Sequence, residues 1–200
     1  MAVFTSVTAE QLSAFLSSYD IGALISHEGI EEGVSNTNYF LTTDKGRYIL
    51  TLFEPRRVRP EDVAFFMDYT IHLEQNGVPC PKTLPRKDRS TRATLNDRPA
   101  AIFSLLDGAN GNVDMLDANL CEQAGALLAQ MHIAAQSFKK SAANNFGMKR
   151  WQDWLTMMAG DMNAIAPGLY KFAADEYDWI ASHWVSDLPS GAIHADFFPD

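Results

Sequence analysis

The sequence has few cysteines, few clustered cations and no long apolar run. Its two cysteines, Cys80 and Cys121, form neither a metal-binding spacing nor a disulfide framework. The 16 basic residues are outnumbered by 25 acidic ones, giving a formal net charge of -9. This balance argues against a nucleic-acid partner, because phosphate contacts need clustered Lys and Arg. The lack of a membrane-length apolar run and of a secretory signal pattern favours a cytoplasmic protein without a membrane partner.

What is present is ordinary for a globular chain of 200 residues, with 46% hydrophobic and 20% charged residues. Alternating apolar residues predict two hairpins in the first half. Their strands are expected at 39–42 with 47–53 and at 92–95 with 100–106. Helical spacing predicts helices elsewhere. We expect one after a capping box at Thr8 and Gln11, and others at 61–76, 117–138, 150–162 and 169–188.

The strands therefore precede most of the helices, which is the order of an α+β protein in two lobes. We expect an N-terminal lobe at 1–106 and the first part of a helical C-terminal lobe at 107–200. A small ligand would bind between such lobes. His132, late in a helix, is expected to be a core residue, and the four tryptophans are expected to pack the helical half.

Two short stretches could carry chemistry. In the first, Gly33 precedes small polar residues (GVSNTN), so backbone N–H groups could face a phosphate without obstruction. It lacks the Gly-Lys-Ser/Thr of a P-loop, and a polar hairpin turn is the alternative. In the second (HAD), Asp196 could accept a proton from a hydroxyl while His194 braces the loop. The alternative is a loop whose His and Asp only satisfy backbone groups.

The order of the segments resembles that of the aminoglycoside-phosphotransferase-like kinases, small-molecule relatives of the protein kinases. The similar stretches are GVSN (33–36), GRYILTLFE (46–54), LEQNGVPCP (73–81), FSLLDG (103–108), GALLAQMH (125–132) and IHADFFPD (193–200). Within the family, the strongest similarity is to the branch that phosphorylates L-homoserine. The resemblance implies a two-lobed, protein-kinase-like α+β fold, with an antiparallel sheet and one regulatory helix in the N-terminal lobe.

The resemblance also implies a reaction and a set of roles. ATP, with Mg²⁺, would transfer its γ-phosphoryl group to the side-chain hydroxyl of L-homoserine, giving O-phospho-L-homoserine for threonine biosynthesis. Asp196 would be the catalytic base and His194 its brace. The nucleotide-binding residues would be Gly33, Ser35, Asn36, Thr37 and Asn38 in the phosphate loop, and Ser104 and Leu106 in the adenine hinge. No metal ligand is expected in the chain itself.

The sequence departs from the kinase pattern in two ways. The strand lysine and helix glutamate that protein kinases pair are replaced by Thr51 and Phe66. Arg47, Arg56, Arg57 or a basic residue of the C-terminal lobe could substitute for the cation. In addition, relatives continue from HADFFPD into an Asn that binds magnesium, whereas this chain stops at Asp200. We therefore expect the chain to be the front part of a kinase, inactive by itself. The alternatives are a kinase for another amino alcohol, such as choline or ethanolamine, and a catalytically silent nucleotide-binding protein.

Overall fold

The computed structural model describes residues 3–31, 35–55, 59–108 and 111–198. The chain divides into two compact units. The first comprises Met1–Ser141 with Gly191–Asp200, and the second is Ala142–Ser190. Because Gly191–Asp200 belongs to the first unit, the candidate catalytic segment packs with the sheet-bearing part of the chain. These units do not test the predicted lobe boundary at residue 106, which stays a prediction.

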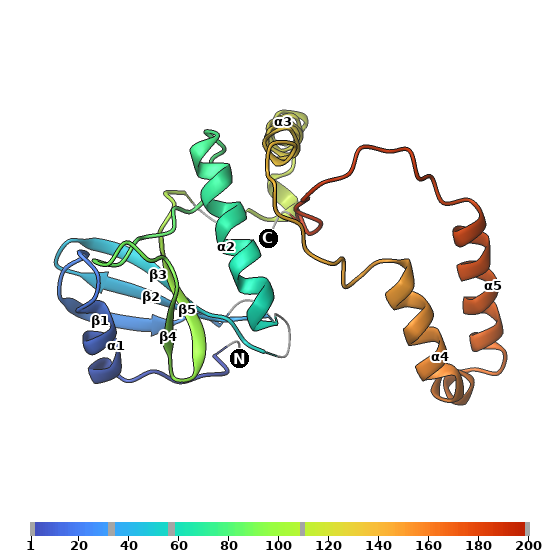
Figure 1. The fold of residues 1–200 in the computed structure, drawn as a ribbon, viewed down its shortest axis with the longest axis horizontal. Helices are drawn as coiled ribbons and strands as arrows, with labels where there is room; N and C mark the ends of the chain where they lie inside the picture. The colour runs from blue at the N-terminus through green and yellow to red at the C-terminus, as the bar shows by residue number, and fades with distance from the viewer. Residues whose placement is uncertain (1–2, 32–34, 56–58, 109–110, 199–200) are drawn as a thin grey trace. The chain divides into compact units, whose positions relative to one another are not determined.

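The first unit is built on a five-stranded antiparallel sheet with the order β1-β2-β3-β5-β4 (Figure 1). Its strands are β1 (Leu24–Gly29), β2 (Thr37–Thr43), β3 (Gly46–Leu52), β4 (Ala93–Leu95) and β5 (Arg98–Ser104). Both predicted hairpins are confirmed. Asn96 and Asp97 turn the second one with φ of 49° and 60°, the left-handed pair that a type I′ hairpin requires.

The two faces of the sheet are covered by different helices. Leu50 and Leu52 of β3 point to the face where α1 (Ala9–Leu16) packs, and they share a buried cluster with Leu12. The intervening residues of β3 point to the opposite face, because side chains alternate along a strand. Phe53, just beyond β3, packs there against Met67 of α2 (Pro60–Gln75).

Helix ends follow the local sequence signals. The capping box predicted at Thr8 and Gln11 is present at the start of α1. At the end of α2, Gly77 has φ of 75° and its N–H donates to Glu74, while the Val78 N–H donates to Leu73. These two bonds form a Schellman motif, and Val78 packs on Leu73 as that motif requires.

The first unit also contains η1 (Val113–Met115) and α3 (Ala118–Ala135). The end of α3 packs on α2, with buried Ala134 in one cluster with Leu73. The ring of Phe138, just after α3, lies 5.2 Å from that of Tyr69. His132 is exposed, so the prediction that it is a core residue was wrong.

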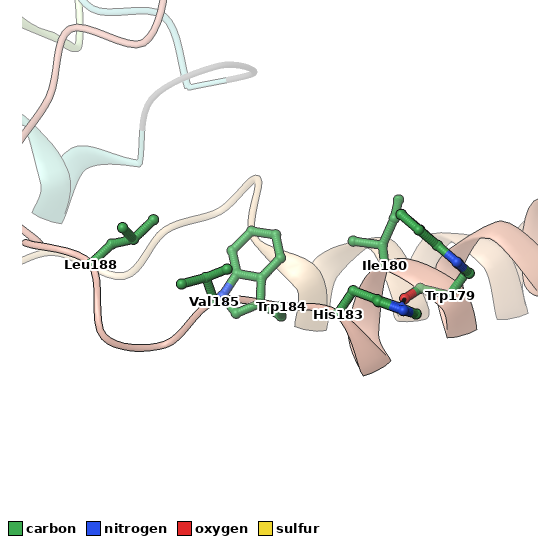
Figure 2. Close-up of a pocket in the computed structure, with 6 residues that line it drawn as sticks. All are labelled: Trp179, Ile180, His183, Trp184, Val185 and Leu188. Carbon is green, nitrogen blue, oxygen red and sulfur yellow. Dashed lines mark hydrogen bonds between the residues drawn. The ribbon is translucent and has the colours of Figure 1, made fainter.

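The second unit is a pair of helices, α4 (Met148–Ile165) and α5 (Leu169–Ser182). A pocket of about 320 Å³ is lined by the end of α5 and the segment after it, by Trp179, Ile180, His183, Trp184, Val185 and Leu188 (Figure 2). Trp179 and Trp184 are 59% and 56% exposed, so the expected packing of the tryptophans is wrong for these two. The helices of the described residues are all too short or too polar to cross a membrane.

The Schellman motif gives a test of the α2 terminus. We expect Gly77→Ala to lower the free energy of unfolding by about 1–2 kcal/mol, because an alanine is strained at positive φ. Gly125→Ala, inside α3 with nothing within 4 Å of the added Cβ, should instead raise it by about 0.5–1 kcal/mol. Urea denaturation followed by far-UV circular dichroism measures both. Equal effects of the two variants would contradict the assignment.

Candidate functional site

All described candidate residues of the nucleotide and catalytic segments lie in the first unit. Gly33 lies outside the described residues. The other candidates fall into three places: the arm that enters β2, the end of β5, and the segment after Gly191. Within the described part of the chain, no hydrogen bond joins the β2 arm directly to the segment of His194 and Asp196.

The arm that enters β2 is held through Asn36 and Thr37. Ser35 is exposed, and Asn36 accepts the backbone N–H of Glu54 at 3.3 Å. Thr37 is fully buried, and its hydroxyl accepts the N–H groups of Phe4 and Thr5 at 3.0 and 3.1 Å. The Thr37 hydroxyl is therefore hydrogen-bonded within the protein. Only the backbone of Thr37 is available to bind a phosphate.

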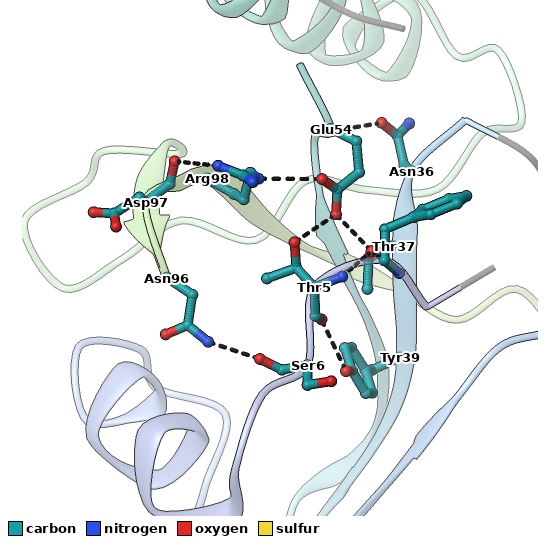
Figure 3. A network of polar contacts seen from close by, with 10 residues as sticks. Thr5, Ser6, Asn36, Thr37, Tyr39, Glu54, Asn96, Asp97 and Arg98 are labelled. Atoms are coloured by element: carbon teal, nitrogen blue, oxygen red, sulfur yellow. Dashed lines mark hydrogen bonds and ion pairs between the residues drawn. The ribbon is translucent and has the colours of Figure 1, made fainter. Parts of the chain in front are cut away.

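The hydroxyl of Thr37 in turn donates to the buried carboxylate of Glu54 at 2.7 Å. The same carboxylate accepts from the Thr5 hydroxyl at 2.8 Å and from Arg98 Nε at 3.1 Å. Figure 3 shows Glu54 at the centre of these contacts, with Asn36 on its backbone side. Sequence reasoning did not identify Glu54 or Arg98. The sequence signal was the acidic residue at the end of an apolar strand (TLFE), where an unpaired charge would be costly.

The electrostatics of Glu54 favour the charged form. Burial alone would raise the pKa of its carboxyl group, but hydrogen bonds from Thr37, Thr5 and Arg98, together with the Arg98 charge, outweigh burial. The pKa of Glu54 consequently lies below its ordinary value. Glu54 is thus an ionised, fully partnered carboxylate at the junction of the N-terminal segment, β2, β3 and β5.

Asn38 and Thr51 lie on the other face of the sheet, the face of α2. The Thr51 hydroxyl donates to Asn38 Oδ1 at 2.8 Å. Thr51 holds the position where the kinase pattern has a lysine, so this face carries a neutral amide and hydroxyl pair in its place. Of the proposed substitutes, Arg47 stacks on Phe40 with 5.5 Å between its guanidinium carbon and the ring centroid, and Arg56 and Arg57 lie outside the described residues.

The predicted hinge begins where β5 ends. The Ser104 N–H donates to the Lys82 carbonyl, and the Ser104 hydroxyl accepts the Lys82 N–H, each at 2.9 Å. These two groups of Ser104 are therefore occupied within the sheet. Leu106 follows the strand with 54% of its surface exposed, in a position open to a ligand.

The segment with His194 and Asp196 makes a tight turn. Ala195 between them has φ of 64°, which costs an alanine about 1–2 kcal/mol. The turn lets the Asp196 N–H donate to His194 Nδ1 at 3.3 Å, while the role of His194 as a brace in catalysis stays a prediction. The Asp196 side chain is exposed and can reach a hydroxyl group brought to it. Backbone strain of this kind gathers at functional sites.

Helix α2 supports this turn through Tyr69. The Tyr69 hydroxyl donates to the carbonyl of Ala192 at 3.3 Å, and burial raises the pKa of Tyr69, so the hydroxyl remains a donor. Phe66, at the position of the kinase glutamate, is 44% exposed and contacts the ring of Phe65 edge to face. The link from α2 to the catalytic segment is thus a neutral hydrogen bond, which sequence reasoning did not identify.

Metal binding was tested on the side chains present. Among the described residues, no three His, Cys, Asp or Glu side chains lie close enough together to hold a metal ion. The described residues therefore do not fit a resident metal ion.

The fold and these segments place the chain in a known enzyme family. The chain belongs to the phosphotransferase enzyme family (APH), whose family model matches residues 26–200. Solved structures with a similar fold include amicoumacin kinase hAmiN in complex with AMP-PNP, Ca²⁺ and Ami (TM-score 0.72, 14% identity, 94% of this chain and 57% of that one). Spectinomycin phosphotransferase APH(9)-Ia with ADP and spectinomycin is also similar (TM-score 0.63, 13% identity, 92% and 60%). The expected two-lobed kinase-like α+β fold is confirmed.

Curated relatives are more similar in sequence. The chain is 40% identical over 200 residues to the homoserine kinase of Sinorhizobium fredii, matching all of this chain and 60% of that protein. It is 42% identical over 201 residues to the homoserine kinase of Rhodopseudomonas palustris, of which the match covers 61%. The chain thus spans about three fifths of the length of these relatives.

The Glu54 carboxylate predicts an acid-dependent stability. Because its folded pKa is lowered, the stabilisation is fully present above its ordinary pKa of 4.5 and is lost as pH falls through the lowered folded value. Glu54→Gln should cost roughly 1–3 kcal/mol at neutral pH and lose less further stability on acidification than wild type. Urea denaturation between about pH 7 and pH 3 measures this. Glu122→Gln, at an exposed site on α3, controls for the change in net charge, and an identical acid limb for both variants would contradict the prediction.

Proposed function

We propose that this chain supplies the nucleotide lobe and the proton-accepting loop of an ATP-dependent kinase that phosphorylates the side-chain hydroxyl of L-homoserine. The observation that carries the proposal is identity of about 40% over the whole chain to homoserine kinases. The matched region includes the polar loop, the hinge and the segment of Asp196. The product would be O-phospho-L-homoserine.

In this proposal the nucleotide lies on the α2 face of the sheet. Backbone N–H groups of the loop at Gly33, Ser35 and Asn36 would face the phosphates, since short side chains leave them open. Leu106, exposed after β5, would offer backbone groups to adenine. Mg²⁺ would accompany the triphosphate as its counterion.

The chemical step uses Asp196. Its carboxylate accepts the proton of the homoserine hydroxyl as that oxygen bonds to the γ-phosphorus, and the bond from the γ-phosphorus to the β,γ-bridging oxygen breaks, so that ADP leaves. Little covalent chemistry is asked of the protein in such a transfer, and most of the catalysis is positioning. The proposal is supported by the Ala195 turn, which points His194 at the Asp196 backbone.

A second candidate is a nucleotide-binding protein without catalysis. It is favoured by the neutral residues at the positions of the kinase ion pair, Thr51 bonded to Asn38 and Phe66 packed on Phe65. Loss of both charges together avoids leaving one unpaired. Such a protein would bind the nucleotide and leave every acceptor unphosphorylated.

Replacement of the base separates the two candidates. We expect Asp196→Asn to lower kcat at least about a hundredfold, because an amide cannot accept the proton, while the Kd for AMP-PNP with Mg²⁺ stays near that of wild type. The assay couples ADP release to NADH oxidation. It is run on this chain and on the chain followed by the C-terminal part of the Sinorhizobium fredii relative beyond the match.

The outcomes decide between the candidates. Activity only in the extended protein, lost in its Asp196→Asn variant, supports the kinase and the expected inactivity of the chain by itself. Full activity after the replacement would overturn the role of Asp196. Nucleotide binding without turnover in either protein, with the relative itself active under the same conditions, would favour the silent protein.

The acceptor is tested in the extended protein with a panel of alcohols. We expect kcat/KM for L-homoserine to exceed that for choline and ethanolamine by at least about a hundredfold, because a site built to pair an amino acid's charged groups rejects ligands that lack the carboxylate, and to exceed that for L-serine, which is one methylene shorter, by at least about tenfold. Mass spectrometry of the product identifies the phosphorylated oxygen. A preference for choline or ethanolamine would replace the homoserine proposal with the amino-alcohol kinase.

A further inference from the structure

The buried network around Glu54 adjoins the proposed phosphate loop without facing it. Because side chains alternate along a strand, Thr37 and Glu54 point to the same face of the sheet as Leu50 and Leu52, which is the face covered by α1. The side chains of Asn38 and Thr51 point to the opposite face of the sheet, which is the face proposed for the nucleotide. With Glu54 only 7% exposed and its oxygens bonded to three partners, the carboxylate acts on a nucleotide through the backbone alone.

That backbone is the arm on which the loop ends. The two residues after Ser35 are both bonded to Glu54, Asn36 to its N–H at 3.3 Å and Thr37 to its carboxylate at 2.7 Å. Thr37 is further held by the N–H groups of Phe4 and Thr5. The point at which the loop joins the sheet is therefore attached both to the end of β3 and to the N-terminal segment.

Stability alone is a weak reason for such a network. A buried ion pair is commonly no better for stability than apolar side chains of similar volume, but it imposes a fixed geometry. At this junction the fixed geometry is that of the loop's C-terminal arm, where a shift of the backbone would move any N–H group aimed at a phosphate.

We infer that Glu54 and Thr37 are positioning residues, which hold Asn36 from behind the sheet so that the backbone N–H groups of Ser35 and Asn36 are preorganised for the nucleotide phosphates. This inference rests on the nucleotide-binding part of the proposed function. It adds a specific claim: nucleotide affinity depends on side chains that the nucleotide never touches.

Two buried threonines of β2 provide a matched test. Thr37 and Thr43 point to the same face, are 0% and 4% exposed, and each donates its hydroxyl to a buried acceptor, Glu54 for Thr37 and the Ile21 carbonyl for Thr43 at 2.5 Å. They stand at opposite ends of β2, about 20 Å apart at 3.3 Å per residue. Thr37→Val and Thr43→Val thus delete comparable hydroxyl groups, next to the loop and far from it.

The measured quantity is the Kd of this chain for AMP-PNP with Mg²⁺, by isothermal titration calorimetry, with urea denaturation of each variant. We expect Thr37→Val to raise the Kd about tenfold, the loss of one hydrogen bond to a charged group. Thr43→Val should lower stability and leave the Kd within about twofold, as for distant independent sites. Arg98→Lys, which keeps the positive charge beside Glu54 but loses the guanidinium hydrogen bond, should raise the Kd in the same direction if Thr37→Val fails to fold.

The outcomes separate this inference from the proposed function. If the wild-type chain binds AMP-PNP, and the Thr37 and Arg98 variants bind it as tightly as the Thr43 variant does, the network is structural only and the inference is overturned. If the wild-type chain itself does not bind AMP-PNP, the proposed nucleotide binding by the chain is overturned, and the inference that rests on it is overturned with it. Weaker binding by folded Thr37 or Arg98 variants, with the Thr43 variant unchanged, supports the positioning role.

Discussion

The carboxylate of Glu54 ties together segments that are far apart in the sequence. Thr5, Thr37 and Arg98 contact it from the N-terminal segment, β2 and β5, while Glu54 itself lies just after β3. Removal of one partner leaves a buried charge uncompensated, which is far more costly than removal of both. The positions of these segments are therefore interdependent. The N-terminal segment in particular, which adds no strand to the sheet, is fixed by the acceptor oxygen of Thr37.

The alternation of side chains along β2 and β3 separates the two tasks of the sheet. One face buries Leu50, Leu52 and the Glu54 network against α1 and the N-terminal segment. The other presents Asn38 and Thr51 and packs Phe53 on α2. The buried Glu54 network thus lies on the face away from the proposed nucleotide. Since a one-residue slip of β2 would exchange the faces, the buried pair of Thr37 and Glu54 also fixes the register on which the proposed site depends.

Much of the local structure could be predicted because its signals are local. The hairpin turn at Asn96, the capping box at Thr8 and the helix stop at Gly77 each depend on residues a few positions apart. The Glu54 network could not be predicted in this way, since its partners lie 17, 44 and 49 positions away. The positive φ of Ala195 is also invisible in sequence, because it is imposed on an alanine from outside. For the candidate site, sequence identified the segments, and the structure identified the side chains that hold them.

The way α2 meets the catalytic segment explains how a kinase-like fold can keep its geometry without the ion pair of protein kinases. That pair couples the helix to the sheet through opposite charges. Here the sheet side is neutral at Thr51, and α2 is bound instead by Phe53 and Met67 to the sheet and by the Tyr69 hydroxyl to the Ala192 carbonyl. Apolar burial and a neutral hydrogen bond depend little on salt, unlike exposed charges. The placement of Asp196, the base in the proposed function, then depends on the packing of α2 and on the turn at Ala195.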